Sequence, residues 1–175
     1  MGIRPAEKAD AARIAEIYRH YVTNTVVTFD LEAPSVGEWE HRLRTTKDAG
    51  YPVLVTCEDS LVVGYALVTA WKQRPAYRYT AEVSIYLDPA FTGAGRGRAL
   101  LQHLVDEARR AGFRQLIALI ADAGHEASVA LHRALGFRMI GRMERVGFKH
   151  DRWIDVDILQ LGLDDSDGPV GILGS

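Results

Sequence analysis

The stretch that decides the fold is Leu87-Asp88-Pro89-Ala90-Phe91-Thr92-Gly93-Ala94-Gly95-Arg96-Gly97-Arg98, which joins a strand-like run at 79–87 to a helix-like run at 98–111. Its glycines stand at alternate positions, where the missing Cβ lets a backbone approach a ligand closely. The first amides of the helix that follows lack partners within the helix and attract anions. The stretch therefore predicts a pyrophosphate-binding turn, and the alternative is a glycine-rich turn that binds nothing.

Two familiar phosphate-binding loops do not match this turn. A P-loop requires Lys and then Ser or Thr after the last glycine, where this chain has Arg98-Ala99. The dinucleotide fingerprint requires another glycine spacing and an acid on the next strand, and the run at 115–120 ends without one. The residues TGAGRG at 92–97 instead resemble the acyl-CoA loop of the Gcn5-related N-acetyltransferases (GNAT), Gln/Arg-x-x-Gly-x-Gly/Ala, with Thr92 replacing Gln or Arg. The resemblance implies that backbone amides hold an acyl-CoA pyrophosphate, with charge added by Arg96 and Arg98.

The composition fits a single compact enzyme domain. The chain has 175 residues, of which 47% are hydrophobic and 25% charged, with a net charge of −2. It can therefore bury a sizeable core, and it has no general electrostatic attraction for nucleic acid. No apolar run suggests a membrane span and the N-terminus does not resemble a signal peptide, so we expect a cytoplasmic protein with one domain at 1–163 and a flexible tail at 164–175. The single Cys57 excludes an internal disulfide and is expected to be a buried, inert thiol.

Hydrophobic periodicity and capping residues predict one alternating α/β unit. Asp10 is placed to cap the first helix, and Ser35 and Glu38 have the spacing of a capping box for the second. Further helices are expected at 98–111 and 127–135, a hairpin turn at Asp59-Ser60 and a polar turn at 149–152. The expected strands are 3–5, 52–58, 61–70, 79–87, 116–120, 138–148 and 153–161. The resemblance implies an α/β GNAT fold, with a mixed, mostly antiparallel sheet of about seven strands, flanked by four helices and splayed at the acyl-CoA cleft.

The strand before the glycines carries the candidate chemistry. Period-two alternation gives it one apolar face and one polar face, the latter made of Thr80, Glu82, Ser84 and Tyr86. The strand is either an edge strand with one wet face or the wall of a cleft with Glu82 at its floor. A partly desolvated carboxylate has a raised pKa and can take a proton from an amine, directly or through one water. Glu82 is therefore the candidate general base, and a backbone N–H near Tyr86 or Leu87 is the candidate donor to a thioester carbonyl oxygen.

Three further segments resemble the phosphinothricin acetyltransferases in order and spacing. They are WKQRPAYRYTAE at 71–82, SVALHRALGF at 128–137 and GFKHDRWIDV at 147–156. The resemblance runs from about Ile3 to Leu163. It implies acetyl-CoA-dependent acetylation of the α-amino group of phosphinothricin, methionine sulfoximine or methionine sulfone, by direct attack of the amine and without a covalent enzyme intermediate. It also implies a homodimer.

Residue by residue, the resemblance implies roles at three places. Glu82 matches the general base, Tyr86 lines the acetyl end, and His132 lies near the thioester, where it is expected to hydrogen-bond the oxyanion or the departing sulfur. The residues implied to bind the amino-acid substrate, together with Glu82, are Phe29, Lys72, Arg74, Pro75 and Tyr77. The residues implied to bind acetyl-CoA are Ile85, Tyr86, Leu87, Thr92, Gly93, Ala94, Gly95, Arg96, Gly97, Arg98, His125 and Ser128. His125 stands where the family pattern usually has Asn.

Each of these residues has a structural alternative. Lys72 and Arg74 can be solvated surface charges, and His132 can be a half-buried histidine with both ring nitrogens satisfied. Phe29 and Tyr77 can be packing aromatics. The other histidines have no partners at metal-ligand spacing, so no metal is expected. Two further functions stay open, a protein or peptide N-acetyltransferase on the same fold and a non-catalytic acyl-CoA-binding module.

Overall fold

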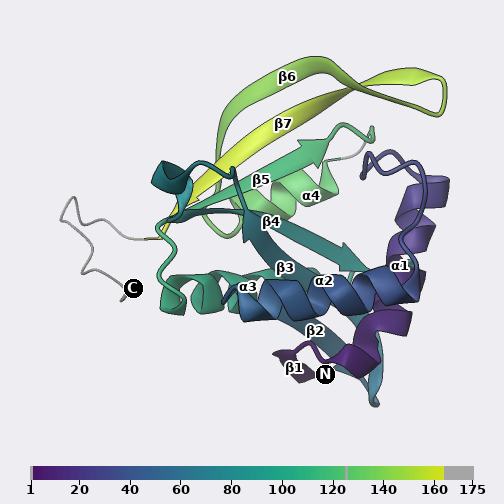
Figure 1. Cartoon of the computed structure of the whole chain (residues 1–175). Helices are drawn as coiled ribbons and strands as arrows, with labels where there is room; N and C mark the ends of the chain where they lie inside the picture. The colour runs from purple at the N-terminus through teal and green to yellow at the C-terminus, as the bar shows by residue number, and fades with distance from the viewer. Residues whose placement is uncertain (1, 125, 164–175) are drawn as a thin grey trace.

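The computed structural model describes residues 2–124 and 126–163, so His125 and the predicted tail at 164–175 lie outside the described residues. The helices are α1 (Ala11–Asn24), α2 (Val36–Asp48), α3 (Arg96–Arg110) and α4 (Ala127–Arg133), with 3-10 turns η1 (Lys8–Asp10), η2 (Pro75–Tyr77) and η3 (Pro89–Phe91). The strands are β1 (Gly2–Pro5), β2 (Val53–Glu58), β3 (Leu61–Ala70), β4 (Thr80–Leu87), β5 (Gln115–Ala121), β6 (Arg138–Lys149) and β7 (Arg152–Gly162). The chain order is coloured in Figure 1.

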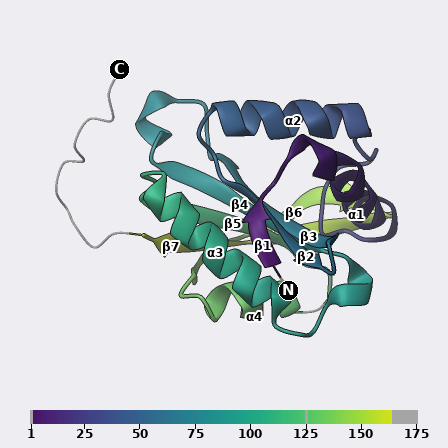
Figure 2. The same cartoon turned by 90° about the horizontal axis from the view of Figure 1, so that it is seen from below.

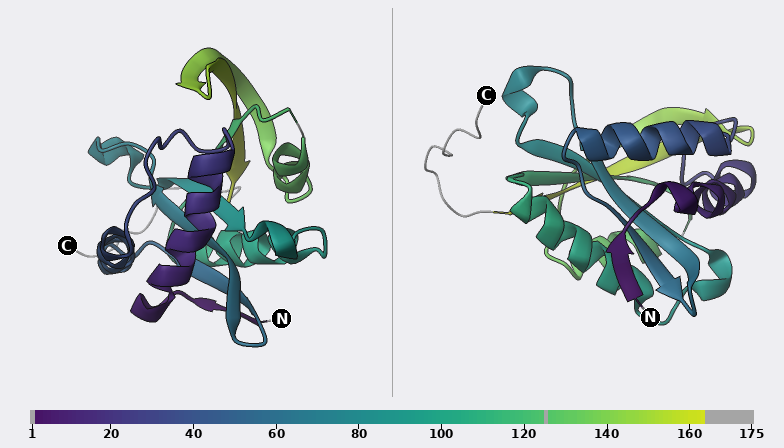
Figure 3. Two further views of the ribbon diagram at one scale, coloured as in Figure 1. Left: turned by 90° about the vertical axis from the view of Figure 1, so that its right-hand side faces the viewer. Right: turned by 60° about the horizontal axis from the view of Figure 1, so that its bottom comes forward.

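The strands of the described residues form one seven-stranded sheet in the order β1-β2-β3-β4-β5-β7-β6. Neighbouring strands run antiparallel except β4 and β5, which are parallel. Figures 2 and 3 show α2 and α3 on opposite sides of the sheet, with α1 on the side of α2 and α4 on the side of α3. The predicted mixed, mostly antiparallel sheet of about seven strands is confirmed, and the edge-strand interpretation of 79–87 is wrong because β4 lies in the middle of the sheet.

Local sequence explains most of the element boundaries. The capping box that begins α2 is present, because Ser35 Oγ accepts from the Glu38 N–H at 3.2 Å and the Glu38 carboxylate accepts from the Ser35 N–H at 2.7 Å. Asp59 and Ser60 both have positive φ, which is typical of the tight turn of a two-residue hairpin. Asp10, however, does not cap α1 with its side chain. Its carboxylate instead accepts a bidentate pair from Arg4 at 2.7 and 2.8 Å, because a charged guanidinium fork binds it more strongly than one helix amide.

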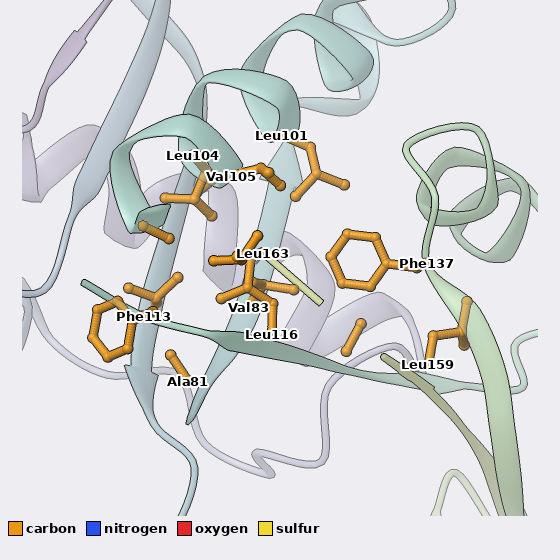
Figure 4. Close-up of a cluster of buried hydrophobic side chains, with 14 of the residues drawn as sticks. Ala81, Val83, Leu101, Leu104, Val105, Phe113, Leu116, Phe137, Leu159 and Leu163 are labelled. Carbon is orange, nitrogen blue, oxygen red and sulfur yellow. The ribbon is translucent and has the colours of Figure 1, made fainter. Parts of the chain in front are cut away.

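Two apolar clusters hold the layers together. On one side α3 packs Leu100, Leu101, Leu104, Val105 and Ala108 against β3, β4 and β5, as Figure 4 shows for part of this cluster. On the other side α1 and α2 bury Ile14, Ile17, Trp39 and Leu43 against β2 and β3. Cys57 packs at the margin of the second cluster and is half-buried rather than buried.

The turn at 149–152 is polar only in part. His150 and Asp151 have positive φ and form the tip of the β6–β7 hairpin, as predicted. Lys149 is not a solvated turn residue, since it ends β6, is only 5% exposed and donates from Nζ to the Thr28 carbonyl oxygen at 2.8 Å. None of the helices in the described residues is long and apolar enough to cross a membrane.

Candidate functional site

The sheet opens where β4 and β5 separate. The two strands pair only from Thr80 with Gln115 to Val83 with Ala118. Beyond that point β4 continues to Leu87 against β3, while β5 continues to Ala121 against β7. A gap therefore forms between the second halves of two central strands.

Two residues of β4 direct their peptide N–H and C=O groups toward this gap. The Tyr79 carbonyl faces β5, since it accepts from the Arg114 and Gln115 amides, whereas the Asp88 amide faces β3 and donates to the Val63 carbonyl at 2.8 Å. Successive residues of a strand direct their N–H and C=O groups to alternate sides. The peptide groups of Ile85 and Leu87 therefore face the gap, and their N–H groups are available to a ligand.

A cavity of about 480 Å³ fills the gap and is walled by β4, β5, the glycine turn and α4. Its lining includes most of the predicted acetyl-CoA contacts, namely Ile85, Tyr86, Leu87, Thr92, Gly93, Gly95, Gly97, Arg98 and Ser128, and also the predicted catalytic residue His132. Sequence reasoning missed several other lining residues, namely Tyr21, Val27, Ala118, Leu119, Ile120, Ala121, Ala123, Ala127 and Leu131. Helical spacing from Ser128 and His132 is a signal that points to Ala127 and Leu131. The open stretch of β5 had no signal in the sequence, because its apolar residues look the same in a paired strand.

Tyr21 of α1 is a lining residue with a polar role that the sequence did not indicate. Its ring packs against the apolar cluster under α1 and α2, and its hydroxyl donates to the Leu87 carbonyl at 2.5 Å. Arg13, also on α1, donates to the Val62 carbonyl at 3.0 Å and pairs with Asp88. The end of β4 is thus fixed by α1 rather than by a neighbouring strand on the β5 side.

The glycine turn presents the start of α3 to the cavity. Asp88 accepts from the Ala90 N–H at 2.8 Å and begins η3. Gly93 and Gly95 then have φ of +86° and +77°, a conformation that disfavours other residues. The first hydrogen bond within α3 runs from the Ala99 N–H to the Gly95 carbonyl at 3.1 Å. The amides of residues 96–98 precede it and have no helix carbonyl to bind, so this end of the cavity attracts an anion.

Arg96 and Ala94 differ from the prediction, because neither lines the cavity. The Arg96 guanidinium turns instead to Glu58 at the end of β2, with 2.8 Å between Nε and Oε2. Its positive charge is thus neutralised by a carboxylate, and Arg98 supplies the cationic side chain in the cavity wall. The Arg96 side chain therefore points away from the cavity.

His132 is buried in the cavity wall, with 3% of its surface exposed. Its Nδ1 lies 2.8 Å from the Ser128 carbonyl oxygen, which can only accept, so Nδ1 carries the proton. Burial lowers the pKa of the ring and favours the neutral form. Nε2 is therefore an acceptor, and it has no partner among the described residues. The interpretation of His132 as a satisfied histidine is wrong, and in this tautomer Nε2 cannot donate to an oxyanion.

The polar face of β4 extends from the cavity toward Glu82. Ser84 and Tyr86 line the cavity, while Glu82 lies one step further along the same face, outside the lining. It is half-buried there and not at the cavity floor. Burial raises the pKa of Glu82, and the positive charge of Lys72 opposes that rise. Burial also raises the pKa of Tyr86 far enough to keep its hydroxyl neutral.

The predicted amino-acid-binding residues do not share one cavity in this structure. Lys72 packs its ammonium over the Trp71 ring at 4.5 Å and is the charge that acts on Glu82. Arg74, Pro75 and Tyr77 lie in and beside η2, are exposed, and line none of the cavity. Phe29 lies on a different segment, the one between α1 and α2, and 41% of its surface is exposed. No three His, Cys, Asp or Glu side chains of residues 2–124 and 126–163 are grouped to hold a metal ion.

Comparison with known proteins gives matches over nearly the whole chain. Residues 3–158 match the acetyltransferase (GNAT) domain. An L-methionine sulfoximine/L-methionine sulfone acetyltransferase of Salmonella typhimurium is 41% identical over 97% of this chain and 98% of its own. An L-amino acid N-acyltransferase of Escherichia coli is 42% identical over 98% and 99%. The crystal structure of a phosphinothricin acetyltransferase from Sinorhizobium meliloti with acetyl-CoA has a TM-score of 0.93 at 42% identity, covering 99% of this chain and 94% of that one.

The positive φ of Gly95 predicts how a substitution there changes the free energy of unfolding. Gly95→Ala should lower the free energy of unfolding in urea by about 1 kcal/mol, because alanine is strained at positive φ. A Cβ at Gly95 meets no atom within 4 Å, so strain and not collision is the cause. Gly37→Ala, in α2 with equally open space, is the control and should leave stability unchanged or raise it by up to about 1 kcal/mol. Equal effects at the two positions would contradict the assigned backbone conformation.

Proposed function

The chain belongs to the GNAT acetyltransferase family, and from this premise we propose that it acetylates the α-amino group of a small amino-acid analogue of the methionine sulfoximine, methionine sulfone or phosphinothricin type. It is an acyltransferase and its co-substrate is acetyl-CoA. The observation that carries the proposal is the gap between β4 and β5, which leads from the free amides of α3 to the polar face that holds Glu82. The names of the relatives support the choice of acceptor.

The residues of the gap fit acetyl-CoA. The free amides at 96–98 and the side chain of Arg98 suit a pyrophosphate, as a helix N-terminus with an arginine does elsewhere. The peptide groups of Ile85 and Leu87, which have no strand beside them, suit the amides of the pantetheine arm. Ser128 and Leu131 on α4 form the opposite wall. Bound in this way, acetyl-CoA supplies the acetyl group as a thioester.

We assign the proton transfers to residues on the two sides of the gap. Glu82 takes a proton from the substrate ammonium, so that the amine nitrogen can form its bond to the thioester carbon as the carbon–sulfur bond breaks. The N–H of Leu87 or Ile85 stabilises the charge that develops on the carbonyl oxygen. As the amide forms, its nitrogen gives its second proton to the lone pair of His132 Nε2, and the ring readily releases that proton because burial lowers its pKa. That position suits transfer of the proton to the departing thiolate.

We assign the acceptor's anionic groups to the segment between β3 and β4. Lys72 lies close enough to Glu82 to alter its pKa, so an anion held by Lys72 is near the base. Arg74 and Tyr77 add a second cation and a hydroxyl on the same exposed segment. We assign Phe29, on the segment between α1 and α2, to contact with the acceptor. The positive charges of Lys72 and Arg74 repel a cationic peptide and so disfavour its binding at this segment.

We further propose that two copies of the chain associate through the β6–β7 hairpin. Three large apolar side chains of this hairpin are about half exposed, namely Val146 (49%), Phe148 (55%) and Trp153 (55%). Large apolar side chains that are exposed together on adjoining strands mark an interaction surface. Phe148 and Trp153 stand opposite each other in the register, with ring centroids 5.2 Å apart. Because β6 is also an edge of the sheet, a second copy covers both the rings and the free edge.

A thiol-release assay with acetyl-CoA tests the proposed acceptor class. The panel contains methionine sulfoximine, methionine sulfone, phosphinothricin, free methionine and a mixed-sequence peptide. Turnover is expected with one or more of the oxygen-bearing analogues and not with the peptide, because Lys72 and Arg74 favour a small anionic acceptor. Turnover with the peptide alone would identify a protein acetyltransferase, and acetyl-CoA binding without any turnover would identify a binding module.

Glu82→Gln tests the general base. Removing the carboxylate should reduce kcat by about 10²–10⁴-fold at neutral pH while acetyl-CoA affinity stays the same. In the wild type, kcat/KM should fall as the pH drops through the pKa of Glu82, because only the carboxylate accepts a proton. Since burial raises that pKa, this fall should lie above the ordinary value of 4.5, and it should be absent in the variant. Glu16→Gln, at an exposed position on α1, is the control; equal turnover in both variants would refute the assignment.

Light scattering tests the association. The wild type should have twice the chain mass of 19.4 kDa, and Phe148→Glu with Trp153→Glu should reduce it to a single chain, because two charges cannot be buried unpaired. Leu61→Glu, at a position 46% exposed on β3, is the matched control and should stay associated. A wild type of 19.4 kDa at micromolar concentration would contradict this proposal.

A further inference from the structure

The tip of the β6–β7 hairpin binds the segment between α1 and α2, more than a hundred residues away in the chain. We call residues 25–34 the acceptor loop, since Phe29 lies in it. Lys149 donates to the Thr28 carbonyl at 2.8 Å, and His150 Nε2 lies 3.2 Å from the Thr25 carbonyl. Figure 1 shows the hairpin tip reaching toward this loop. The third contact is between Phe29 and Gly147.

Gly147 leaves room for the ring of Phe29. A Cβ at Gly147 would lie 2.3 Å from two atoms of that ring, closer than any real contact. Gly147 does not have positive φ, so its backbone would accept another residue. The glycine is therefore needed by the ring and not by the strand. Any side chain at this position displaces Phe29.

Lys149 holds the backbone of the same loop from inside the protein. A buried lysine ammonium requires a hydrogen-bond acceptor, and here the acceptor is the Thr28 carbonyl. Burial lowers the pKa of Lys149, and the negative charge of Asp30, one residue beyond Phe29, opposes that change. Lys149 and Gly147 thus both affect Phe29. Lys149 binds the peptide group before it, and Gly147 leaves the space that its ring occupies.

The loop is connected in turn to the wall of the acetyl-CoA cavity. The Tyr18 hydroxyl donates to Asp30 at 2.8 Å and lies 2.6 Å from Thr28 Oγ1. The Tyr18 ring meets the ring of Tyr86 edge to face, with centroids 5.1 Å apart. A shift of the loop therefore moves the neighbours of Tyr86, at the end of the cavity where the acceptor meets the acetyl group.

We propose that Gly147 and Lys149 are positioning residues that fix Phe29 over the acceptor site, so that the hairpin tip determines which acceptors fit. The inference rests on the proposed function, in which Phe29 contacts the acceptor. Neither residue touches the reacting atoms. The space above the acceptor is set by the absence of a side chain at 147 and by the hydrogen bond from Lys149 to Thr28.

Gly147→Ala, Lys149→Met and Lys149→Arg test this proposal, and Gly141→Ala is the control. Gly141 is on the same strand, lacks positive φ, and has no atom within 4 Å of its Cβ position. Gly147→Ala and Lys149→Met should raise the acceptor KM by about tenfold, because a displaced loop weakens acceptor binding, while the KM for acetyl-CoA changes less than about twofold. Lys149→Arg keeps a cationic donor and should recover part of the loss. Hydrogen exchange at 25–34 should be faster in Gly147→Ala than in Gly141→Ala.

The outcomes separate this proposal from the proposed function. Equal exchange at 25–34 in Gly147→Ala and Gly141→Ala would overturn it, because the hairpin would then not hold the loop. Faster exchange with an unchanged acceptor KM would overturn it as well, because the loop would then not shape the acceptor site. A wild type that acetylates no analogue would refute the proposed acceptor class, while the exchange comparison would still decide whether the hairpin holds the loop.

Discussion

The site depends on the point at which β4 and β5 stop pairing. A central strand normally has neighbours along its whole length, because unpaired peptide groups away from water are costly. Here pairing ends at Val83 and Ala118, and the four residues from Ser84 to Leu87 have a strand on one side only. Under the proposed function, these exposed peptide groups bind a ligand that itself carries amides. A local loss of sheet pairing is thus offset by binding.

Side chains of α1 and α3 fix the backbone around the gap between β4 and β5. Tyr21 and Arg13 of α1 fix the end of β4 through the Leu87 carbonyl, the Val62 carbonyl and Asp88. The ion pair of Arg96 with Glu58 fastens the start of α3 to the end of β2. These contacts hold the start of α3 and the end of β4 beside one another in the wall of one cavity.

The sequence alone was most informative where structure is encoded locally. Alternate glycines, period-two polarity at 80–86 and the Ser35–Glu38 box predicted the turn, the polar strand face and the helix start. It failed where a distant partner decides the outcome. Arg96 finds Glu58 thirty-eight residues away, and Lys149 finds Thr28 at a separation of 121. Asp10 prefers the guanidinium of Arg4 to the helix amides, and the open half of β5 has the same apolar composition as a paired strand. Such choices depend on tertiary neighbours that no local pattern specifies.

The position of β7 has a consequence for synthesis of the chain. Because β7 lies between β5 and β6, the last strand of the described residues fills an inner place in the sheet. While the ribosome is still adding residues 152–162, β5 has an open edge and β6 has no strand to join. An open apolar edge invites pairing with other nascent chains. The β5–β7–β6 part of the sheet, in which β5 forms one wall of the cavity, can therefore assemble only after translation has passed Gly162.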